Sequence, residues 1–393
     1  MIRSLKSIYH YILSCIAIVW YGFPGNKIKV IGVTGTDGKT TTTTLIYEVL
    51  HASGMKVSMI SSVHAIIGGK IYDTGFHVTT PDAFFVQKYL RQAVDHGDTH
   101  MVLEVTSHGL AQHRVHGVPF EVGVITNITH EHLDWHRTFE HYKATKLSLL
   151  KRAKTAVVNR DESELFADAM PLLRNKRVVS YGIRREAQIT PQTHPFTTKL
   201  PGEFNKYNCL AAISVAELFS IPWNVTKKAI KSFPGIPGRM EMVATTPVKI
   251  IVDFAHTPNA IDRALKTART MTKKRLIHVF GSAGLRDASK RPLMGEASSR
   301  YADIIVLTEE DYRTEDVEKI MDEIASGIAP GPKVLRFASR AKAIQMALSL
   351  AKKGDVLILT GKGHEKSLCR GTVEYPWSDQ KEVKRLLSRT KNA

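Results

Sequence analysis

Short apolar runs alternate with longer segments of helical periodicity over most of the chain. Between residues 28 and 233, the runs rich in β-branched residues are 28–33, 57–60, 101–105, 122–126 and 155–159. Such runs are typical of strands buried on both faces of a parallel sheet, and the helical segments between them are typical of βαβ crossovers. The pattern predicts an α/β fold with a P-loop-type central parallel sheet.

A Pro/Gly-dense segment at residues 233–238 interrupts this alternation. Beyond it the pattern resumes, with apolar runs at 249–253, 276–280, 304–308, 333–337 and 356–360. Segments of this composition form turns and linkers between domains. We therefore expect a central domain over residues 28–235 and a second, Rossmann-like α/β domain over residues 236–393.

Residues 1–27 form an N-terminal extension with a periodicity of its own. Apolar side chains recur at positions 2, 5, 8, 9, 12, 16, 19 and 20, which predicts an amphipathic helix. Its fully apolar stretch, residues 15–21, is far shorter than the about 20 residues that cross a bilayer. Two alternatives stay open: a helix packed on the domain that follows, and a helix lying in a membrane interface through residues 1–21.

The chain has 393 residues, a net charge of +18 and three cysteines. This charge permits binding to nucleic acid or to an anionic membrane, and it equally suits an enzyme whose substrates are polyanions such as ATP. The basic residues are spread along the chain without a nucleic-acid-binding motif, so we expect no nucleic-acid partner. Cys15, Cys209 and Cys369 lie far apart, as is typical of reduced thiols in a cytoplasmic protein.

A glycine-rich turn, GVTGTDGKTT at residues 32–41, joins the first predicted strand to a predicted helix at 41–50. In that context, backbone N–H groups and the helix dipole form a phosphate cradle. Lys39 can reach the phosphates, and Thr40 offers a hydroxyl to Mg²⁺. The strict Walker spacing requires a glycine where this chain has Val33, so the loop predicts nucleotide binding of a variant type.

Further polar clusters follow other predicted strands, at the edge where open α/β sheets bind their ligands. Glu104 ends a buried strand and is the candidate acidic residue for Mg²⁺. A second cluster, residues 127–136, contains His130, His132 and His136. Most of it is typical of a solvated loop, and its spacing does not match a zinc site.

In the second domain, Arg286, Arg313 and Glu365 follow three of the predicted strands. Arginine offers a bidentate fork to a carboxylate, and a glutamate can meet an ammonium group. Together the three suit a zwitterionic amino acid, although each alone is equally consistent with a surface ion pair.

Taken in order, these motifs resemble those of the Mur ligase family, closest to its MurE-type branch of UDP-N-acetylmuramoyl-tripeptide synthetases. The resemblance runs from residue 28 to residue 387. It rests on GTDGKTT at 35–41, TTPD at 79–82, EVTSHGLAQHR at 104–114, NITHEHLD at 127–134, GEFNKYN at 202–208, GRME at 238–241, DFAHTP at 253–258, KRPLMG at 290–295 and GKGHE at 361–365.

The resemblance implies an ATP-dependent ligase of peptidoglycan precursor synthesis, acting as a cytoplasmic monomer. In that reaction ATP phosphorylates a carboxylate of a muramoyl-dipeptide acceptor. The amine of a diamino acid then displaces phosphate from the acyl phosphate and leaves an amide. The demands on the protein are positioning and charge neutralisation.

The resemblance also implies roles for individual residues. Catalytic roles fall on Lys39, Glu104, His132 and Lys146, and the ligands of two Mg²⁺ ions are Thr40, Glu104, His132 and a Lys146 carbamylated by CO₂. Contacts to ATP fall on Gly35, Thr36, Asp37, Gly38, Lys39, Thr40, Thr41, Asn205, Asn208, Asp253 and His256. Contacts to the acceptor fall on Thr79, Thr80, Thr106, Gln112 and Arg114, and contacts to the amino acid on Arg286, Glu310, Asp311, Arg313, Gly361 and Glu365. The helical pattern around Lys146 gives that residue no special status by itself.

Three departures from the family pattern bear on the substrates. The family has a uridine-binding domain before the P-loop, whereas 31 residues precede Gly32 here, so the carrier of the acceptor is open between UDP, a lipid and another peptide. The family's Asp-Asn-Pro-Arg motif reads Glu-Asp-Tyr-Arg at 310–313. It keeps the arginine for the distal carboxylate of meso-diaminopimelate and so favours this amino acid over lysine. The family's Asp-His pair is Glu131-His132, which preserves the charge.

Two other functions stay open. One is a related ligase with a folate-type or poly-amino-acid acceptor, against which GKGHE and the loop around Arg286 argue. The other is a non-catalytic nucleotide-binding partner of a cell-wall complex, anchored through residues 1–21. Lys39, Glu104 and Lys146 argue against it, because a binding module does not need them.

Overall fold

The computed structural model describes residues 2–72, 80–129 and 133–391. The chain divides into two compact units, residues 1–234 and 235–393, and the division falls within the Pro/Gly-dense segment. Each unit has its own sheet and its own hydrophobic core.

An eight-stranded sheet forms the centre of the first unit, in the order β4-β3-β2-β5-β1-β6-β7-β8. The strands β2 to β3 and β3 to β4 pair antiparallel, and all other neighbours pair in parallel. Their bounds are β1 (Lys29–Thr34), β2 (Val57–Ile60), β3 (Ala65–Ile67), β4 (Lys70–Tyr72), β5 (His100–Glu104), β6 (Phe120–Ile125), β7 (Thr155–Asn159) and β8 (Arg177–Tyr181). Because β2, β5, β1 and β6 are parallel neighbours, their carboxyl ends meet at one edge of the sheet.

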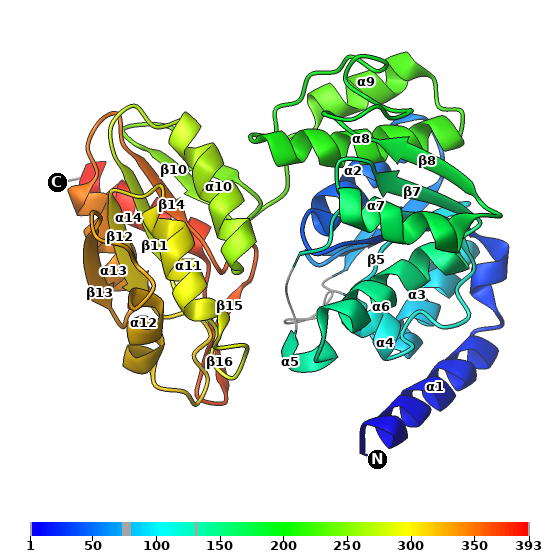
Figure 1. The fold of residues 1–393 in the computed structure, drawn as a ribbon, viewed down its shortest axis with the longest axis horizontal. Helices are drawn as coiled ribbons and strands as arrows, with labels where there is room; N and C mark the ends of the chain where they lie inside the picture. The colour runs from blue at the N-terminus through cyan, green and yellow to red at the C-terminus, as the bar shows by residue number, and fades with distance from the viewer. Residues whose placement is uncertain (1, 73–79, 130–132, 392–393) are drawn as a thin grey trace. The chain divides into compact units, whose positions relative to one another are not determined.

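Helices cover both faces of this sheet, with α3 and α6 on one face and α2 and α8 on the other (Figure 1). The α-helices of the unit are α1 (Ile2–Trp20), α2 (Lys39–Ala52), α3 (Ala83–His96), α4 (Ser107–Ala111), α5 (Leu133–His136), α6 (Phe139–Arg152), α7 (Ser163–Ala169), α8 (Glu203–Leu218) and α9 (Trp223–Ser232). Its described residues also include the 3₁₀ turns η1 (Pro24–Lys27) and η2 (Met170–Leu173). Side chains cap several helices; for example, Phe85 N donates to Asp82 Oδ1 at the start of α3, at 3.1 Å.

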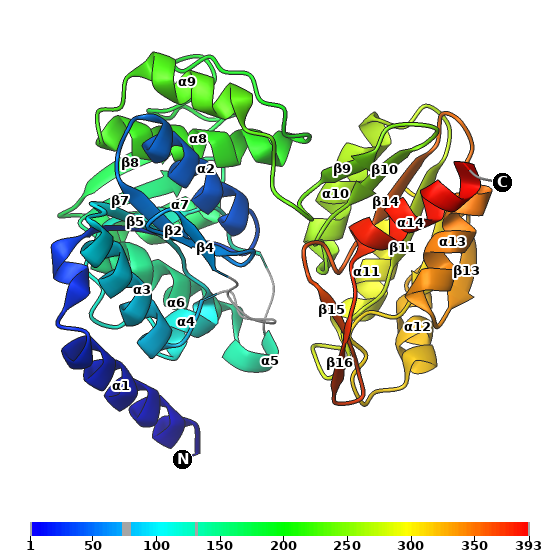
Figure 2. The same cartoon turned by 180° about the vertical axis from the view of Figure 1, so that it is seen from behind.

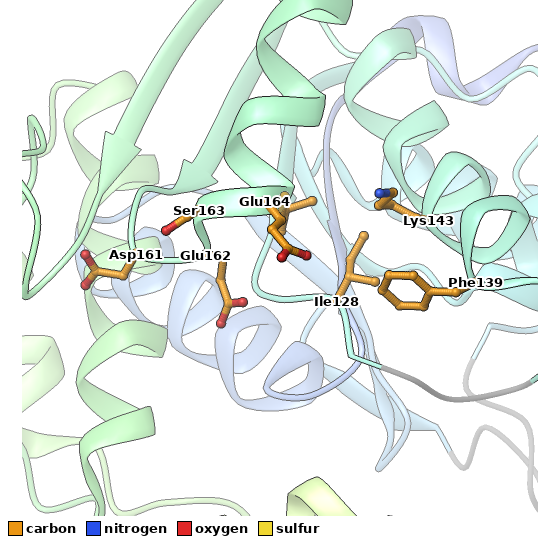
Figure 3. A pocket seen from close by; sticks show the side chains of 8 residues that line it. Ile128, Phe139, Lys143, Asp161, Glu162, Ser163 and Glu164 are labelled. Atoms are coloured by element: carbon orange, nitrogen blue, oxygen red, sulfur yellow. The ribbon is translucent and has the colours of Figure 1, made fainter.

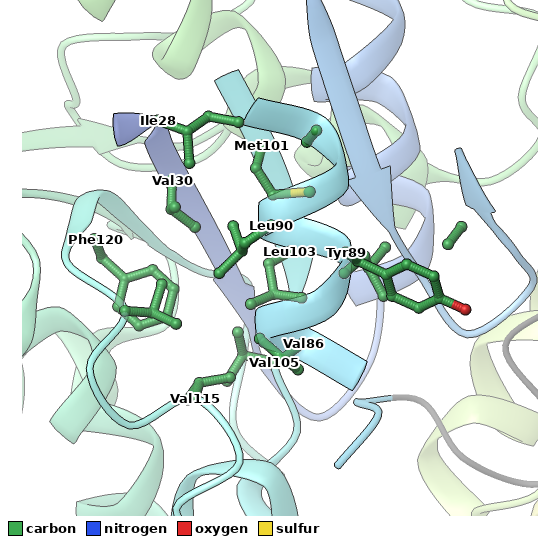
Figure 4. Close-up of a cluster of buried hydrophobic side chains, with 14 of the residues drawn as sticks. Ile28, Val30, Val86, Tyr89, Leu90, Met101, Leu103, Val105, Val115 and Phe120 are labelled. Carbon is green, nitrogen blue, oxygen red and sulfur yellow. The ribbon is translucent and has the colours of Figure 1, made fainter. Parts of the chain in front are cut away.

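One hydrophobic cluster of the first unit lies between α3 and the central strands (Figure 4). Val86 and Leu90 project from α3 onto Val30, Met101 and Leu103 of the sheet, and all five are buried. Burial of each such side chain contributes roughly 1.5–3 kcal/mol. This packing fixes the strands whose carboxyl ends carry the polar motifs.

The second unit has a six-stranded sheet in the order β13-β12-β11-β14-β10-β9, parallel except for β9 (Figure 2). Its strands are β9 (Glu241–Ala244), β10 (Lys249–Val252), β11 (Leu276–Phe280), β12 (Ile304–Thr308), β13 (Lys333–Phe337) and β14 (Val356–Leu359), with a separate hairpin of β15 (Ser367–Arg370) and β16 (Val373–Pro376). Its helices are α10 (Pro258–Thr270), α11 (Lys290–Ser299), α12 (Val317–Ala325), α13 (Arg340–Leu350) and α14 (Asp379–Lys391).

Two buried polar groups stand out in the second unit. Arg340 and Asp379 form a fully buried ion pair, with Nη2 2.6 Å from Oδ2, and Arg340 Nη2 also donates to Thr360 O at 2.9 Å. His278 is fully buried between Ser298 Oγ at 2.8 Å and Thr360 Oγ1 at 2.9 Å. Both groups therefore converge on Thr360, directly after β14.

All ten strands predicted from the apolar runs are present, with ends that lie within two residues of the predicted ones. The strands β3, β4, β8, β9, β15 and β16 were not predicted. Among the residues that the structure describes, none of the helices combines the length and apolar content needed to cross a membrane.

His278 should make the protein less stable in acid. Burial, and then the charge of Arg340, lower the pKa of His278 to about 3, whereas an unfolded histidine titrates near pH 6.5. Between these values the unfolded chain binds one more proton, so the free energy of unfolding falls by about 1.4 kcal/mol per pH unit of acidification. His278→Gln should reduce the slope of unfolding free energy against pH by about this amount, as measured by denaturant unfolding from pH 6.5 to 4. His51→Gln, the same change at an exposed histidine, is the control, and equal slopes for wild type and His278→Gln would contradict the assignment.

Candidate active site

The glycine-rich loop lies between β1 and α2 and is held in place by the carboxyl end of the neighbouring strand β6. Thr36 N donates to Asn127 O at 2.8 Å, and Asp37 N donates to Asn127 Oδ1 at 2.9 Å. Thr126 Oγ1 donates in return to Asp37 O at 2.6 Å. These bonds fix the loop at the N-terminus of α2, where helix N–H groups and the helix dipole favour a phosphate.

Two further contacts bring cationic and amide side chains to the loop. Lys39 Nζ donates to Thr36 O at 2.7 Å, so its side chain folds over the loop. From α8, Asn208 Oδ1 accepts from Thr42 Oγ1 at 3.2 Å, and Asn208 Nδ2 donates to Asn205 Oδ1 at 2.9 Å. Of the two asparagines predicted near adenosine, Asn208 thus contacts the first turns of α2, and Asn205 contacts Asn208.

The carboxylate of Glu104 lies beside the first turn of α2. It is 1% exposed, and its oxygens accept from Thr40 Oγ1 at 3.1 Å, Ser62 N at 2.8 Å and Ser62 Oγ at 2.9 Å. A carboxylate grouped with hydroxyls is the oxygen donor set that Mg²⁺ prefers. Ser62 was not predicted. The available signal was that it follows the run 57–60, which forms the strand next to the one that ends in Glu104.

Lys146 is buried at the P-loop. Its side chain is 2% exposed, Nζ donates to Gly35 O at 2.6 Å, and the amine lies 4.7 Å from the centre of the Tyr142 ring. Tyr142 in turn hydrogen-bonds with Thr36 through its hydroxyl, at 3.0 Å. The structure thus places Lys146 beside the phosphate cradle, which its helical pattern did not indicate.

Four of the residues predicted to contact the acceptor form one hydrogen-bonded group. Thr80 Oγ1 lies 3.1 Å from Thr106 Oγ1 and donates to Glu104 O at 3.0 Å. Arg114 donates to Thr80 O at 2.6 Å through Nη1 and to Gln112 Oε1 at 2.6 Å through Nη2. The group is attached to the strand that ends in Glu104.

Some of the predicted residues lie outside the part of the chain that the structure describes, namely Thr79, Glu131 and His132, as does His130. His136, in the same cluster, is only 2% exposed and packs against the rings of Tyr142 and His108. His136 is therefore an exception to the interpretation of most of this cluster as solvated loop. Among the described residues, no group of three or more His, Cys, Asp or Glu side chains is arranged to hold a metal ion.

In the second unit, two of the residues predicted to contact the amino acid pair with a buried lysine. Lys362 Nζ lies 2.7 Å from Asp311 Oδ1 and 2.5 Å from Glu365 Oε2. Although burial alone would lower it, the two carboxylates raise the pKa of Lys362. Burial raises the pKa of Glu310, whose Oε2 lies against Gly361. Lys362 was not predicted, although it is the second residue of GKGHE.

The two predicted arginines of this unit differ in their surroundings. Arg313 Nη1 donates to Gly284 O at 2.6 Å, and Arg286 is an exposed residue of the loop that contains Gly284. The other two residues predicted near adenosine follow β10, where Asp253 accepts from Met240 N at 2.7 Å and Lys290 Nζ donates to His256 O at 2.9 Å.

A polar pocket of about 290 Å³ opens beside α6 and α7 in the first unit (Figure 3). It is lined by Ile128, Phe139, Lys143, Asp161, Glu162, Ser163, Glu164 and Leu165, none of which was predicted as a site residue. Asp161 accepts hydrogen bonds from Ile183 N, Arg184 N and Tyr207 Oη, at 2.7 to 2.9 Å. Its carboxylate thus serves the local structure.

Comparison with known proteins covers both units. The family model of the Mur ligase middle domain matches residues 33–216, and that of the Mur ligase, glutamate ligase domain matches residues 238–363. A UDP-N-acetylmuramoyl-L-alanyl-D-glutamate–2,6-diaminopimelate ligase of Aquifex aeolicus is 37% identical over 386 aligned residues, which cover 94% of this chain and 79% of the relative. A UDP-N-acetylmuramyl-tripeptide synthetase of Roseiflexus sp. is 37% identical over 417 aligned residues, covering 96% and 82%.

Solved structures show the same likeness. One of a UDP-N-acetylmuramoyl-L-alanyl-D-glutamate–2,6-diaminopimelate ligase has a TM-score of 0.61 at 29% identity, covering 93% of this chain and 79% of that one. A folylpolyglutamate synthase of Mycobacterium tuberculosis has a TM-score of 0.71 at 17% identity, covering 88% and 91%. At that identity the second likeness concerns the fold alone.

Gly38 provides a test of the phosphate cradle. Its φ is +80°, and a Cβ there would lie 2.4 Å from Asn208 Oδ1. Gly38→Ala should weaken ATP binding by at least about tenfold, because the loop must shift away from the N-terminus of α2. A fluorescent ATP analogue measures the affinity. The control is Gly54→Ala at the other end of α2, where φ is +85° and no atom lies within 4 Å of the added Cβ; equal losses in both variants would contradict the cradle.

Proposed function

This chain belongs to the Mur ligase family of ATP-dependent, ADP-forming ligases, and we propose that it adds meso-diaminopimelate to the D-Glu of a muramoyl-L-Ala-D-Glu acceptor. One observation carries the proposal: relatives named for this reaction are similar to the chain over both units, at 37% and 36% identity. The product is a peptidoglycan precursor. The carrier that we propose for the acceptor is UDP, as in the names of these relatives.

The proposed reaction has two steps. The terminal phosphoryl group of ATP passes to the D-Glu carboxylate, giving ADP and an acyl phosphate. The amine of the amino acid then attacks the acyl carbon, loses a proton, and expels phosphate as the amide forms. The protein contributes orientation of the reactants and neutralisation of their charge, for which Lys39 over the P-loop and the N-terminus of α2 are suited.

Mg²⁺ fits the residues that surround the carboxylate of Glu104. Thr40, Ser62 and Glu104 supply the hydroxyl and carboxylate oxygens that the ion prefers, and we propose Thr40 and Glu104 as ligands of one ion. His132 and Lys146 are proposed for a second ion. Bound Mg²⁺ would neutralise charge on the phosphoryl group in transfer.

We further propose that Lys146 is carbamylated. Its neutral amine would add to the carbon of CO₂ and release a proton, which replaces a cation by a carboxylate-like anion. The position of Lys146 supports this proposal: its amine is buried 2.6 Å from a P-loop carbonyl, where a carboxylate-like anion would balance the charge of a bound metal ion.

We propose that the amino-acid substrate binds at the group of residues around Lys362. Arg313 and Arg286 would bind carboxylates of the amino acid, and Glu365, Glu310, Asp311 and Gly361 would surround the rest of it. Arginine suits the distal carboxylate of diaminopimelate, which lysine lacks. We propose that the acceptor is bound by Thr79, Thr80, Thr106, Gln112 and Arg114.

We also propose that the protein works as a monomer in the cytoplasm, where ATP and the nucleotide-linked precursors are available. Peripheral contact with a membrane through residues 1–21 is a separate proposal, for which the exposed face of α1 is the ground.

An acceptor-by-amino-acid matrix tests the substrates. The full chain with ATP and Mg²⁺ is given UDP-linked, lipid-linked or free muramoyl-L-Ala-D-Glu, each with diaminopimelate or lysine. We expect phosphate release and a heavier product, detected by mass spectrometry, with the UDP-linked acceptor and diaminopimelate. Turnover with lysine but not with diaminopimelate would overturn the proposed amino acid. Turnover only with another acceptor would overturn the proposed carrier, and no turnover with any combination would overturn the proposed function.

Lys146→Ala tests the carbamylated lysine. The variant should lose turnover by on the order of 10²-fold, the size expected when one preorganised charge is removed, and short-chain carboxylates such as acetate should restore part of it. The control is Lys143→Ala, one turn earlier on α6, where the lysine pairs with Asp168. Full turnover in Lys146→Ala, or a loss in a correctly folded variant that no carboxylate restores, would contradict the role.

A further inference from the structure

Helix α1 packs on the first unit through the face that contains Ser7, Tyr11 and Ile18. Ser7 Oγ lies 3.2 Å from His113 Nε2, and the centre of the Tyr11 ring lies 5.5 Å from that of His113 and 4.7 Å from that of His116. Ser14 and Ala17, on the same face, are fully buried. These contacts, with those to α3, fix the rotation of α1 about its own axis.

The packing of α1 on the first unit is tight at the C-terminal end of the helix. Ile18 is buried against Gly117, where an added Cβ would lie 2.3 Å from Ile18 Cδ1. The Gly117 position therefore has no room for a side chain while Ile18 is in place. This fit leaves little freedom for α1 to turn its other face inward.

The opposite face of α1 is an exposed apolar stripe, which consists of Ile8, Tyr9, Ile12, Ile16, Val19 and Trp20. All six are exposed, Trp20 to 76% and Val19 to 66%. At 100° per residue they fall within an arc of about 120°. A periodicity of this kind normally predicts the face that packs on the protein, yet here the whole stripe lies outward.

In both views α1 runs along the edge of its unit, with its N-terminal part extending beyond the helices that cover the sheet (Figures 1 and 2). Phe23, which follows the helix, is exposed as well. A contiguous apolar surface of this kind on a folded protein marks a binding surface for a partner or for a membrane.

The charge of the N-terminal segment indicates what the stripe meets. The chain has four basic residues before its first acidic one, Asp37: Arg3, Lys6, Lys27 and Lys29. Aromatic and aliphatic side chains on a helix with flanking basic residues are typical of helices that lie in the headgroup region of anionic membranes. A second copy of this chain would bring like charges together, which opposes self-association through this face.

We propose that the exposed stripe of α1 docks the protein on an anionic lipid surface. The helix would lie in the plane of the interface, with Trp20 and Tyr9 at the headgroup level and the aliphatic side chains between them in the acyl boundary. The positive charge of the segment would attract the anionic headgroups. The docking stands independently of the proposed ligase reaction, because no residue predicted for the active site lies on α1.

Vesicle flotation of the full chain tests this proposal. We expect the protein to float with vesicles of phosphatidylcholine and phosphatidylglycerol, and to float less with phosphatidylcholine alone. Raising the salt to 1 M should weaken the binding, because the Debye length falls from about 10 Å at 0.1 M to about 3 Å. Ile12→Glu/Ile16→Glu should reduce the vesicle partition coefficient at least about tenfold.

The matched control is Ile71→Glu/Leu172→Glu, which makes the same kind of change at two exposed apolar residues away from α1. It should float like wild type. Flotation that is equal in both double variants would overturn the proposal, and so would flotation that does not depend on anionic lipid. A dimer in solution that Ile12→Glu/Ile16→Glu dissociates, without binding of wild type to either vesicle, would assign the stripe to a second copy instead.

Discussion

The parallel pairing of β1 with β5 on one side and β6 on the other is the constraint on which the candidate site depends. Val33 pairs with Glu104, and Thr34 pairs with Ile125, so the P-loop leaves the sheet between a carboxylate and the Thr126–Asn127 turn. The loop is then held by that turn, and Glu104 by Thr40 and Ser62. Apolar side chains under α3 fix the register, so the chemistry of the edge rests on the packing of the core (Figure 4).

Strands buried on both faces were the most predictable part of the fold. A continuous apolar run such as Leu276–Phe280 identifies a strand without any knowledge of the strands with which it pairs. Short or half-exposed strands such as β4, whose three residues are largely outside the core, carried no such pattern. Within the site, Glu104 was predictable from its place after a strand. Lys146 was not predictable from its helix, since local periodicity does not show that a lysine meets the carbonyl of a loop 111 residues away.

Ser62 and Lys362 were missed for the same physical reason. A serine after a strand and a lysine among glycines are ordinary in sequence, and their importance arises from carboxylates that other segments of the same unit bring to them. Helix α1 shows the converse case. Its periodicity predicted a helix correctly. The direction of its apolar face depends on the packing surface formed by His113 and Gly117, and no pattern within the helix can reveal that surface.

The buried pair of Arg340 and Asp379 has a consequence for the end of the chain. Asp379 is the first of the thirteen residues of α14, and Arg340 donates to Thr360 O, one residue before GKGHE begins. Removing one partner of such a pair leaves a buried charge uncompensated, at a cost of about 3–5 kcal/mol. The last helix is therefore part of the folded structure of the second unit. A truncation or a fusion that unfolds the start of α14 would remove the partner of Arg340, and the guanidinium group of Arg340 would transmit this change to the glycine loop.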